Sequence, residues 1–260
     1  MVNKNLTGYF WYALGEIALV VLGILIALQI NNWNEERIEQ NQIREYALSL
    51  TGDLQRDLQM LGPVNGQIQD LIDRSRAMAE YMQGKTIDEI SNIDLFIYSR
   101  SPSYRPFEWN RAALDQLKSS GALRQIKDQL LVRKISEYDA LTKHLDQDYT
   151  NDENNIREAV SVMLEIVDMN YPDSMHLPRV WNDIAEVSQV PPDFYDSAEY
   201  RELKSTDLSL LTKDLGTIKH AVNHFIEIGN ALEARTEIEI PRLRALASEI
   251  DGLINAEYNH

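Results

Sequence analysis

The sequence predicts an all-α protein in which one N-terminal transmembrane helix continues into an elongated antiparallel helical bundle. Three observations lead to this prediction. Residues 9–30 are an apolar run that contains one charged residue, Glu16. The residues that follow are acidic and place apolar side chains at the alternating three- and four-residue steps of packed helices. No segment shows the two-residue alternation of a half-buried strand.

The apolar run is long enough to cross a membrane. As a helix its 22 residues span roughly 33 Å, against about 30 Å for a hydrocarbon core. Tyr9, Trp11 and Tyr12 lie at one end and Trp33 at the other, where aromatic side chains favour headgroup depth. The run is longer than a secretory signal core and lacks a small-x-small cleavage site. We therefore expect a retained anchor.

The flanks of the run set the expected orientation. Lys4 and the terminal amine precede it, and Arg37 follows it, so basic groups are slightly more numerous on the N-terminal side. We expect residues 1–8 to be a short cytoplasmic N-terminus and residues 31–260 to be an acidic domain across the membrane. In a Gram-negative bacterium this is a single-pass inner-membrane protein with a periplasmic C-terminal domain.

Charge excludes one class of partner. The formal net charge is −16, with 41 acidic and 25 basic residues. Nucleic acid requires a basic face to neutralise its phosphates, so we expect no nucleic-acid partner. The same charge disfavours a domain that lies flat on anionic lipid. The absence of cysteine is compatible with either compartment.

Periodicity predicts five helices after the anchor, over residues 34–61, 64–83, 107–119, 129–170 and 206–257. Gly62-Pro63 is expected to end the first of them, because proline removes a backbone donor. Thr206 is the expected N-cap of the last helix, which Pro241 should interrupt. Two charged residues stand in otherwise apolar stripes: Asp57 in the first helix and Asp152 in the heptad helix.

The N-terminal sequence resembles a known family. Residues 12–17, YALGEI, and 19–35, LVVLGILIALQINNWNE, look like the signature of DUF6090, a family of single-pass bacterial membrane proteins of unknown function. Residues 114–123, LDQLKSSGAL, are similar to its second recurring stretch. The resemblance implies a location and an architecture. It implies no chemistry.

One face of the anchor carries its most informative residues: Glu16, Val20, Gly23 and Ala27. Gly23 and Ala27 form a small-xxx-small step that lets a second helix approach closely. A carboxylate in a span is costly and suggests a partner. We favour association with a second copy or another membrane protein. A simple anchor with a protonated or hydrated Glu16 remains open, as does a proton-carrying site.

A connector combines aromatic residues with arginine, a composition common in ligand pockets and protein interfaces. The candidate patch for a ligand or partner comprises Arg100, Tyr104, Arg105, Phe107, Trp109 and Arg111. The alternative, which we favour, is a loop whose aromatic side chains close the end of the bundle.

Two metal motifs are weak. His220, His224 and Glu227 have ligand spacing on a helix, but their register places them on a solvated face. Residues 146–157 start like a calcium loop, with asparagine where glycine is needed and arginine where the bidentate glutamate belongs. We therefore predict no metal site and no cofactor.

The sequence contains no nucleophile elbow, Gly-rich phosphate loop, dinucleotide fingerprint or HExxH motif, so we do not expect an enzyme. The first hypothesis is a membrane-anchored interaction scaffold or sensor-like protein that associates through its transmembrane face and its bundle. Its expected partners are membrane lipid and a second copy or another membrane protein. The alternative is an accessory single-span subunit of an ion-driven or transport complex that uses Glu16.

Overall fold

The computed structural model describes residues 6–91, 95, 104–166, 196–198, 201–202 and 214–258. The regular elements of this described part are all helical, so the predicted fold class is confirmed. The α-helices are α1 (Leu6–Met82), α3 (Ala112–Ser119), α4 (Gln129–Met163), α7 (Leu215–Ala234) and α8 (Ile240–Tyr258). Short 3₁₀ turns occur at η1 (Ile87–Glu89) and η2 (Ala122–Arg124), and a π-helical turn, η4 (Arg235–Glu239), joins α7 to α8.

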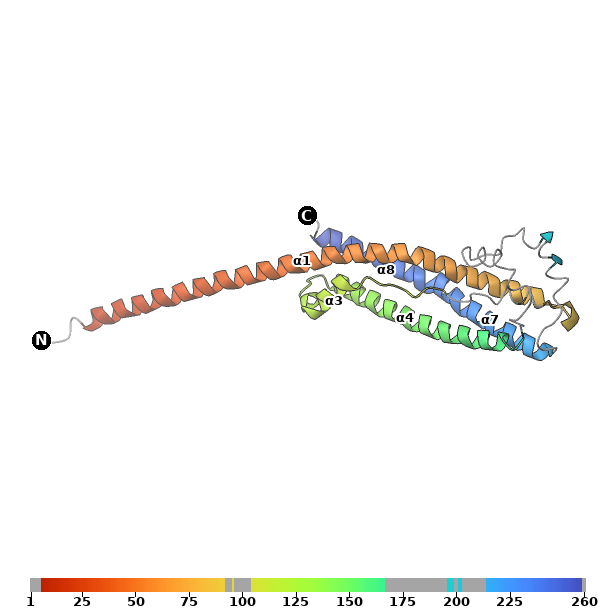
Figure 1. The fold of residues 1–260 in the computed structure, drawn as a ribbon. Helices are drawn as coiled ribbons and strands as arrows, with labels where there is room; N and C mark the ends of the chain where they lie inside the picture. Colours follow the sequence, from red (N-terminus) through yellow and green to blue (C-terminus); the bar gives the residue numbers. More distant parts are fainter. Residues whose placement is uncertain are drawn as a thin grey trace.

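Helix α1 is a single helix of 77 residues, and only its second part belongs to the bundle. Side chains from Phe10 to Glu39 are all exposed, and the first buried side chain is Ile43. The N-terminal part therefore projects from the bundle as an isolated rod (Figure 1). We call residues 31–42, between the apolar run and the bundle, the stalk.

The predicted break at Gly62-Pro63 is wrong, because α1 continues through Pro63. Leu61, Val64 and Ile68 are buried on one stripe that runs across this point, while Pro63 itself is exposed. Burial of each such side chain contributes about 1.5–3 kcal/mol, which together exceeds the roughly 3 kcal/mol that an interior proline costs. Packing of the stripe therefore outweighs the local helix-breaking signal.

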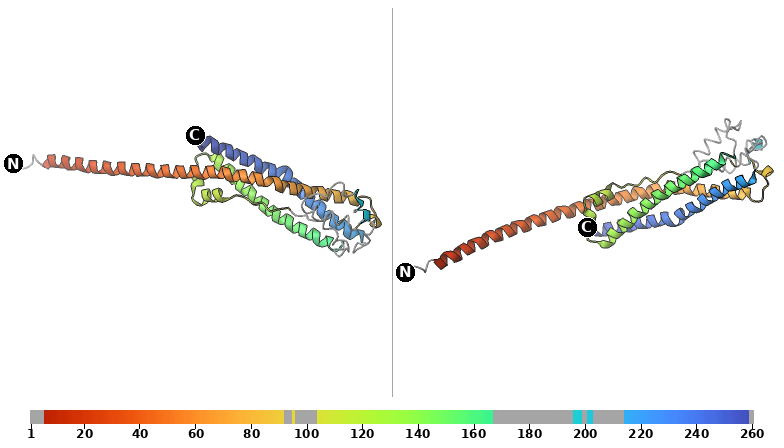
Figure 2. Two further views of the ribbon diagram at one scale, coloured as in Figure 1. Left: turned by 45° about the horizontal axis from the view of Figure 1, so that its top comes forward. Right: turned by 90° about the horizontal axis from the view of Figure 1, so that it is seen from below.

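The bundle consists of α1, α4 and the continuous pair α7–α8, with the short α3 at the end nearest the stalk (Figures 1 and 2). Helices α1 and α4 run in the same direction, and α7–α8 return antiparallel to both. Ion pairs follow the antiparallel pairing, since Lys134 meets Glu249 near the stalk and Asp152 meets Arg235 further along. Apolar side chains from all these helices form one continuous core.

Parallel α1 and α4 require a return connection, and residues 104–111 supply its last part. We call these residues the strap. Hydrogen bonds join the strap to both helices. As the strap advances, its partners on each helix have lower residue numbers. On α1 the partners are Gln67 for Arg105 N and Asp57 for Asn110 N. The strap is extended, so the predicted helix over 107–119 begins only at Ala112.

Two other predicted helix bounds also differ. Helix α4 ends at Met163, short of residue 170, and residues 167–170 lie outside the described part. Helix α7 begins at Leu215 because Asp214 caps it, with its carboxylate accepting from Gly216 N and Thr217 N. Thr206, the expected cap, lies outside the described residues.

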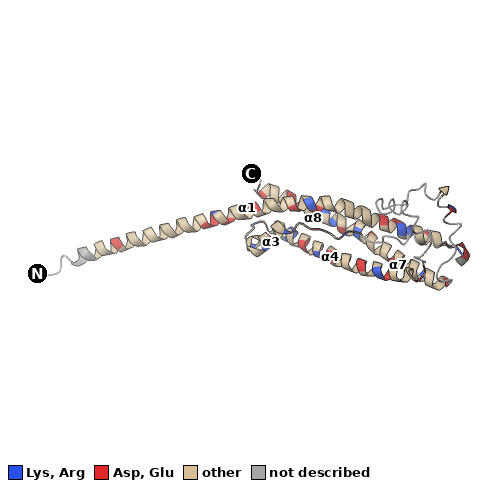
Figure 3. Cartoon of the chain, in the orientation of Figure 1, with Lys and Arg blue, Asp and Glu red and all other residues tan. Residues whose placement is uncertain are grey.

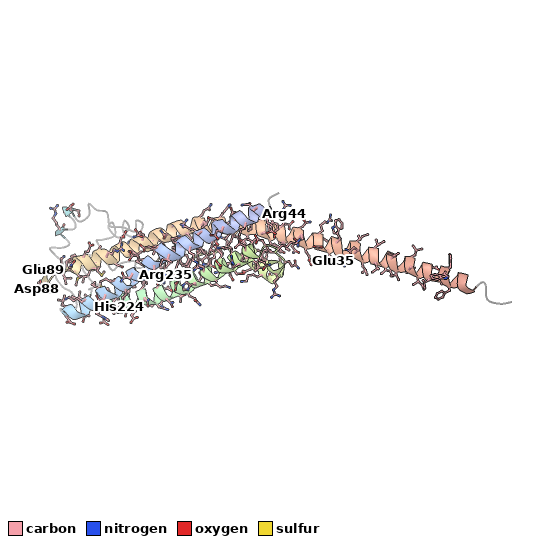
Figure 4. The ribbon with its side chains drawn as sticks, turned by 180° about the vertical axis from the view of Figure 1, so that it is seen from behind. Glu35, Arg44, Asp88, Glu89, His224 and Arg235 are labelled. Carbon is pink, nitrogen blue, oxygen red and sulfur yellow. The ribbon has the colours of Figure 1, made fainter. Side chains whose placement is uncertain are left out.

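Pro241 does not break the last helix. The preceding residues form the π-helical turn η4, and α8 continues from Ile240. Proline cannot donate to the carbonyl four residues earlier, and its ring crowds that carbonyl. A wider π turn is one way in which a helix absorbs this conflict without ending. The turn lies at the centre of the bundle, where Arg235 is found (Figure 4).

Candidate functional site

The predicted face of the anchor is open. Glu16, Val20, Gly23 and Ala27 are all on the exposed rod, and a Cβ atom placed on Gly23 would meet nothing within 4 Å. Charged residues are concentrated on the bundle and the stalk, whereas the rod before them is nearly bare of charge (Figure 3). The described chain therefore offers this face no helix of its own to pack against.

The predicted aromatic–arginine patch is mostly directed inward. Tyr104 and Phe107 are buried, and Phe107 stacks on Trp109 with ring centroids 5.0 Å apart. Trp109 Nε1 and Arg111 Nη2 both donate to the carboxylate of Asp146 on α4. These residues fasten the strap along the groove between α1 and α4, rather than closing the end of the bundle. Arg105 is exposed, and Arg100 lies outside the described residues.

Asp57 is the first of two buried carboxylates that organise the bundle. It is 1% exposed and accepts three hydrogen bonds. Asn110 N and Nδ2 donate to Oδ1 at 2.7 and 2.9 Å, and the Tyr138 hydroxyl donates to Oδ2 at 2.5 Å. Burial, together with the Asp57 carboxylate, raises the pKa of Tyr138 far above its ordinary value. One carboxylate thus joins α1, the strap and α4.

Asp152 is the second buried carboxylate, and it joins α4, the strap and η4. Arg235 donates to it in a bidentate pair, from Nε at 2.8 Å and from Nη2 at 2.7 Å. The Tyr104 hydroxyl donates to the same carboxylate at 2.8 Å. Burial, and then the Asp152 charge, raises the pKa of Tyr104. This network is fully desolvated at its centre, since Asp152 is 3% exposed.

A second set of polar groups adjoins Arg235 and reaches the surface. The ligand atoms of His144, Asp148 and Glu239 lie within 4.8 Å of one another. His144 Nε2 is 3.3 Å from Asp148 Oδ2 and 3.5 Å from Glu239 Oε1. Burial, and then the nearby Asp148 charge, raises the pKa of Glu239. Within the described residues this set has the composition and spacing that could hold a metal ion.

Of the residues with metal-ligand spacing in the sequence, Asp148 belongs to this set, and the histidine pair lies elsewhere. His220 and Glu227 are exposed, and the rings of His220 and His224 meet edge to face with centroids 4.7 Å apart. His224 lies nearer the end of the bundle away from the stalk (Figure 4). The sequence does place His144 and Asp148 four residues apart on one helix. Their third neighbour, Glu239, comes from an element far along the chain.

Asp139 provides a test of the electrostatics of the bundle surface. Burial opposes its ionisation, but hydrogen bonds from Lys118 and Lys143, both at 2.8 Å, outweigh burial and lower the pKa of Asp139. Because the folded pKa is depressed, the stabilisation is complete above the unfolded value of about 3.9 and is lost as pH falls through the folded value. We expect D139N to lose about 1 kcal/mol at neutral pH.

Urea unfolding followed by circular dichroism, along a pH series from 7 to about 3, measures this difference. The gap between D139N and the native chain should shrink toward the acid end of the series. Asp115 on α3 is an exposed aspartate whose substitution by asparagine serves as the control. A gap that stays constant over the series would contradict the assignment.

Together these features define the class of the protein. It is an all-α protein with one helix, near its N-terminus, that is long and apolar enough to span a membrane. Residues 16–96 match the model of a family of unknown function, DUF6090. The resemblance seen in residues 12–35 is thereby confirmed, and the match does not reach residues 114–123. Comparisons with curated proteins and with solved structures give no match.

Proposed function

We propose that the protein is a membrane-anchored helical scaffold of sensor-like design, which crosses the membrane once through α1. One observation supports this above all: α1 runs unbroken from a fully exposed apolar segment into the core of the bundle. Fourteen large apolar or aromatic side chains between Phe10 and Ile30 are at least 47% exposed. Burying them in lipid is worth on the order of 20–40 kcal/mol, against about 3 kcal/mol for one carboxylate.

The proposed location is the inner membrane of a bacterium, with the N-terminus in the cytoplasm and the bundle in the periplasm. The small excess of basic groups before the span supports this orientation. The unbroken helix supports the sensor-like design, because α1 packs against both α7 and α8. A rearrangement of α7 or α8 would therefore shift or rotate the same helix that enters the membrane.

The proposed partner in the membrane is a second α1, from another copy of the chain. Gly23 and Ala27 leave a shallow notch on the face that also carries Glu16 and Val20. Helix association in lipid depends on such close approach and on interhelical hydrogen bonds, which a protonated carboxyl supplies. The bare face of the rod is compatible with this contact.

Disulfide cross-linking tests the contact directly, since the chain has no native cysteine. Ala27 lies on the proposed face, and Leu25 lies on the opposite face of the helix. In native membranes, we expect A27C to form a covalent dimer under mild oxidation and L25C to stay largely monomeric. Equal cross-linking of both variants, or of neither, would count against a specific face.

The alternative function is an accessory subunit of an ion-driven or transport complex, in which Glu16 carries a proton. The position of Glu16 on the notch face supports either role. The A27C cross-link distinguishes the two roles when Glu16 is changed to glutamine. Glutamine can still form a hydrogen bond, but it cannot carry the charge. Undiminished A27C dimers in the E16Q background support self-association. A disulfide between A27C and a different membrane protein, in place of the dimer in both backgrounds, supports the alternative.

A further inference from the structure

The set formed by His144, Asp148 and Glu239 lies beside the Arg235–Asp152 pair, and Arg235 Nη1 also reaches Asp148 and Glu239. Asp148 and His144 are one turn apart on α4, and Glu239 is the last residue of η4. The side chain of His144 is 55% exposed, whereas those of Asp148 and Glu239 are 14% and 20% exposed. The set is therefore half-buried, with one solvent-facing member.

The spacing of the three side chains matches a tetrahedral ion. At metal–ligand distances of about 2.0–2.1 Å, two ligands of such an ion lie about 3.4 Å apart. The His144 Nε2 atom is 3.3 Å from Asp148 Oδ2 and 3.5 Å from Glu239 Oε1. Two of the three edges thus have the required length without movement of the side chains.

The charge balance also favours a divalent cation. Arg235 gives its two short hydrogen bonds to Asp152, at 2.8 and 2.7 Å, which neutralises that pair. Its Nη1 atom is only within 3.5 Å of Asp148 and 4.0 Å of Glu239. Two half-buried carboxylates therefore share an imidazole and one guanidinium whose short hydrogen bonds go to Asp152. A charge of +2 would balance them.

Two carboxylate oxygens in the set are buried without a hydrogen bond from any described residue: Asp148 Oδ2 and Glu239 Oε2. Buried oxygens of this kind normally have a partner. Asp148 Oδ2 is also the atom that faces His144 Nε2. The two oxygens therefore retain hydrogen-bonding capacity for a ligand, in addition to the ion pairs that Asp148 Oδ2 forms with His144 and Arg235.

We propose that His144, Asp148 and Glu239 bind one divalent transition-metal ion of the Zn²⁺ type. An imidazole with two carboxylates suits Zn²⁺, Co²⁺ or Ni²⁺ better than Mg²⁺ or Ca²⁺, which prefer oxygen ligands alone. Water would complete the coordination on the exposed side of His144. The π turn η4 has a role here, because it sets the direction in which Glu239 leaves the helix.

The bound ion would link α4 to the junction of α7 and α8. Both α7 and α8 contact α1, so the site would couple metal occupancy to the rigidity of the helices around the membrane-entering rod. This role for the ion rests on the proposed function. The binding site itself does not, because its evidence lies entirely within the bundle.

The test uses untagged, full-length protein in detergent, stripped of metal with a chelator. Titration with Zn²⁺ against a chromogenic chelator should show one tight site per chain. We expect both E239Q and H144A to weaken binding at least tenfold. H224A should bind as the native chain does, since His224 belongs to the other histidine pair. Zn²⁺ should also raise the Tm of the native chain and leave that of E239Q unchanged.

A spectroscopic readout separates coordination from a general effect on folding. Co²⁺ in a tetrahedral site absorbs far more strongly in the visible region than octahedral aqueous Co²⁺. The native chain and H224A should show these bands, and E239Q should not. Circular dichroism without metal establishes that each variant is folded. If E239Q or H144A is unfolded without metal, D148N takes its place as the variant expected to lose binding. The proposal would be overturned if the native chain showed no stoichiometric site. It would also be overturned if H224A lost the site while E239Q kept it.

Discussion

Replacing Arg235 with alanine lowers the free energy of unfolding of the bundle by about 3–5 kcal/mol. The guanidinium is 8% exposed, and its partner Asp152 is 3% exposed. Removing one member of a buried pair leaves the other charge without compensation in a medium of low dielectric constant. Here the uncompensated charge is on Asp152, and Asp148 and Glu239 lose their nearest cation as well.

Urea unfolding in detergent, followed by far-UV circular dichroism, measures the loss. Arg133 supplies the matched control, because its side chain is 66% exposed and, among the described residues, pairs only with Glu137, at 3.9 Å. R133A should cost less than about 1 kcal/mol, as exposed pairs do. The double variant R235M/D152L should recover much of the loss, since apolar side chains can replace a buried pair. If R235A matches R133A, the pair is not buried as described.

The second large effect is expected at Asp57. D57A should lower the free energy of unfolding by about 3–4 kcal/mol, because it removes several hydrogen bonds to a buried charge. The change leaves the Tyr138 hydroxyl and two Asn110 donors without their acceptor. It also frees the C-terminal end of the strap, at Asn110, from α1. Both consequences follow from one carboxylate that is 1% exposed.

Two measurements distinguish these consequences. Unfolding by urea reports the stability, and limited trypsin digestion reports the strap through the bond after Arg111, whose side chain is held by Asp146. Pro106 blocks cleavage after Arg105. D57A should be cut after Arg111 under conditions that leave this bond intact in the native chain. Y138F, which removes a single hydrogen bond, should cost about 1–2 kcal/mol and leave the strap protected. Equal effects of D57A and Y138F would contradict this reading of Asp57.

The long apolar helix and the helical class could be predicted because both depend on local pattern. An apolar run of sufficient length and a repeat of three and four residues can be seen without knowing what lies opposite. Pro63 and Pro241 could not be judged in the same way. Each is a local helix breaker, and tertiary packing on either side of it decides whether the helix continues.

The buried network left a partial signal in the sequence. Asp57 and Asp152 stood out as charged residues in apolar stripes, and the structure buries both, together with Asp53, which the pattern did not single out. Their partners could not be found, because Asn110 and Tyr138 lie 53 and 81 residues from Asp57. Arg235 is 83 residues from Asp152. Nothing in periodicity selects these partners from the other polar residues of the chain.

The stalk has an electrostatic consequence for a chain with a net charge of −16. In the proposed membrane-anchored arrangement, its 12 residues extend about 18 Å, of which the headgroups would take roughly 5–8 Å. The remaining distance, about 10 Å, exceeds the Debye length of about 8 Å at physiological salt. Mobile ions therefore screen the acidic bundle from anionic lipid, and repulsion between them becomes appreciable only in dilute salt. In this arrangement, the length of the stalk lets a strongly acidic domain stand over a negatively charged surface.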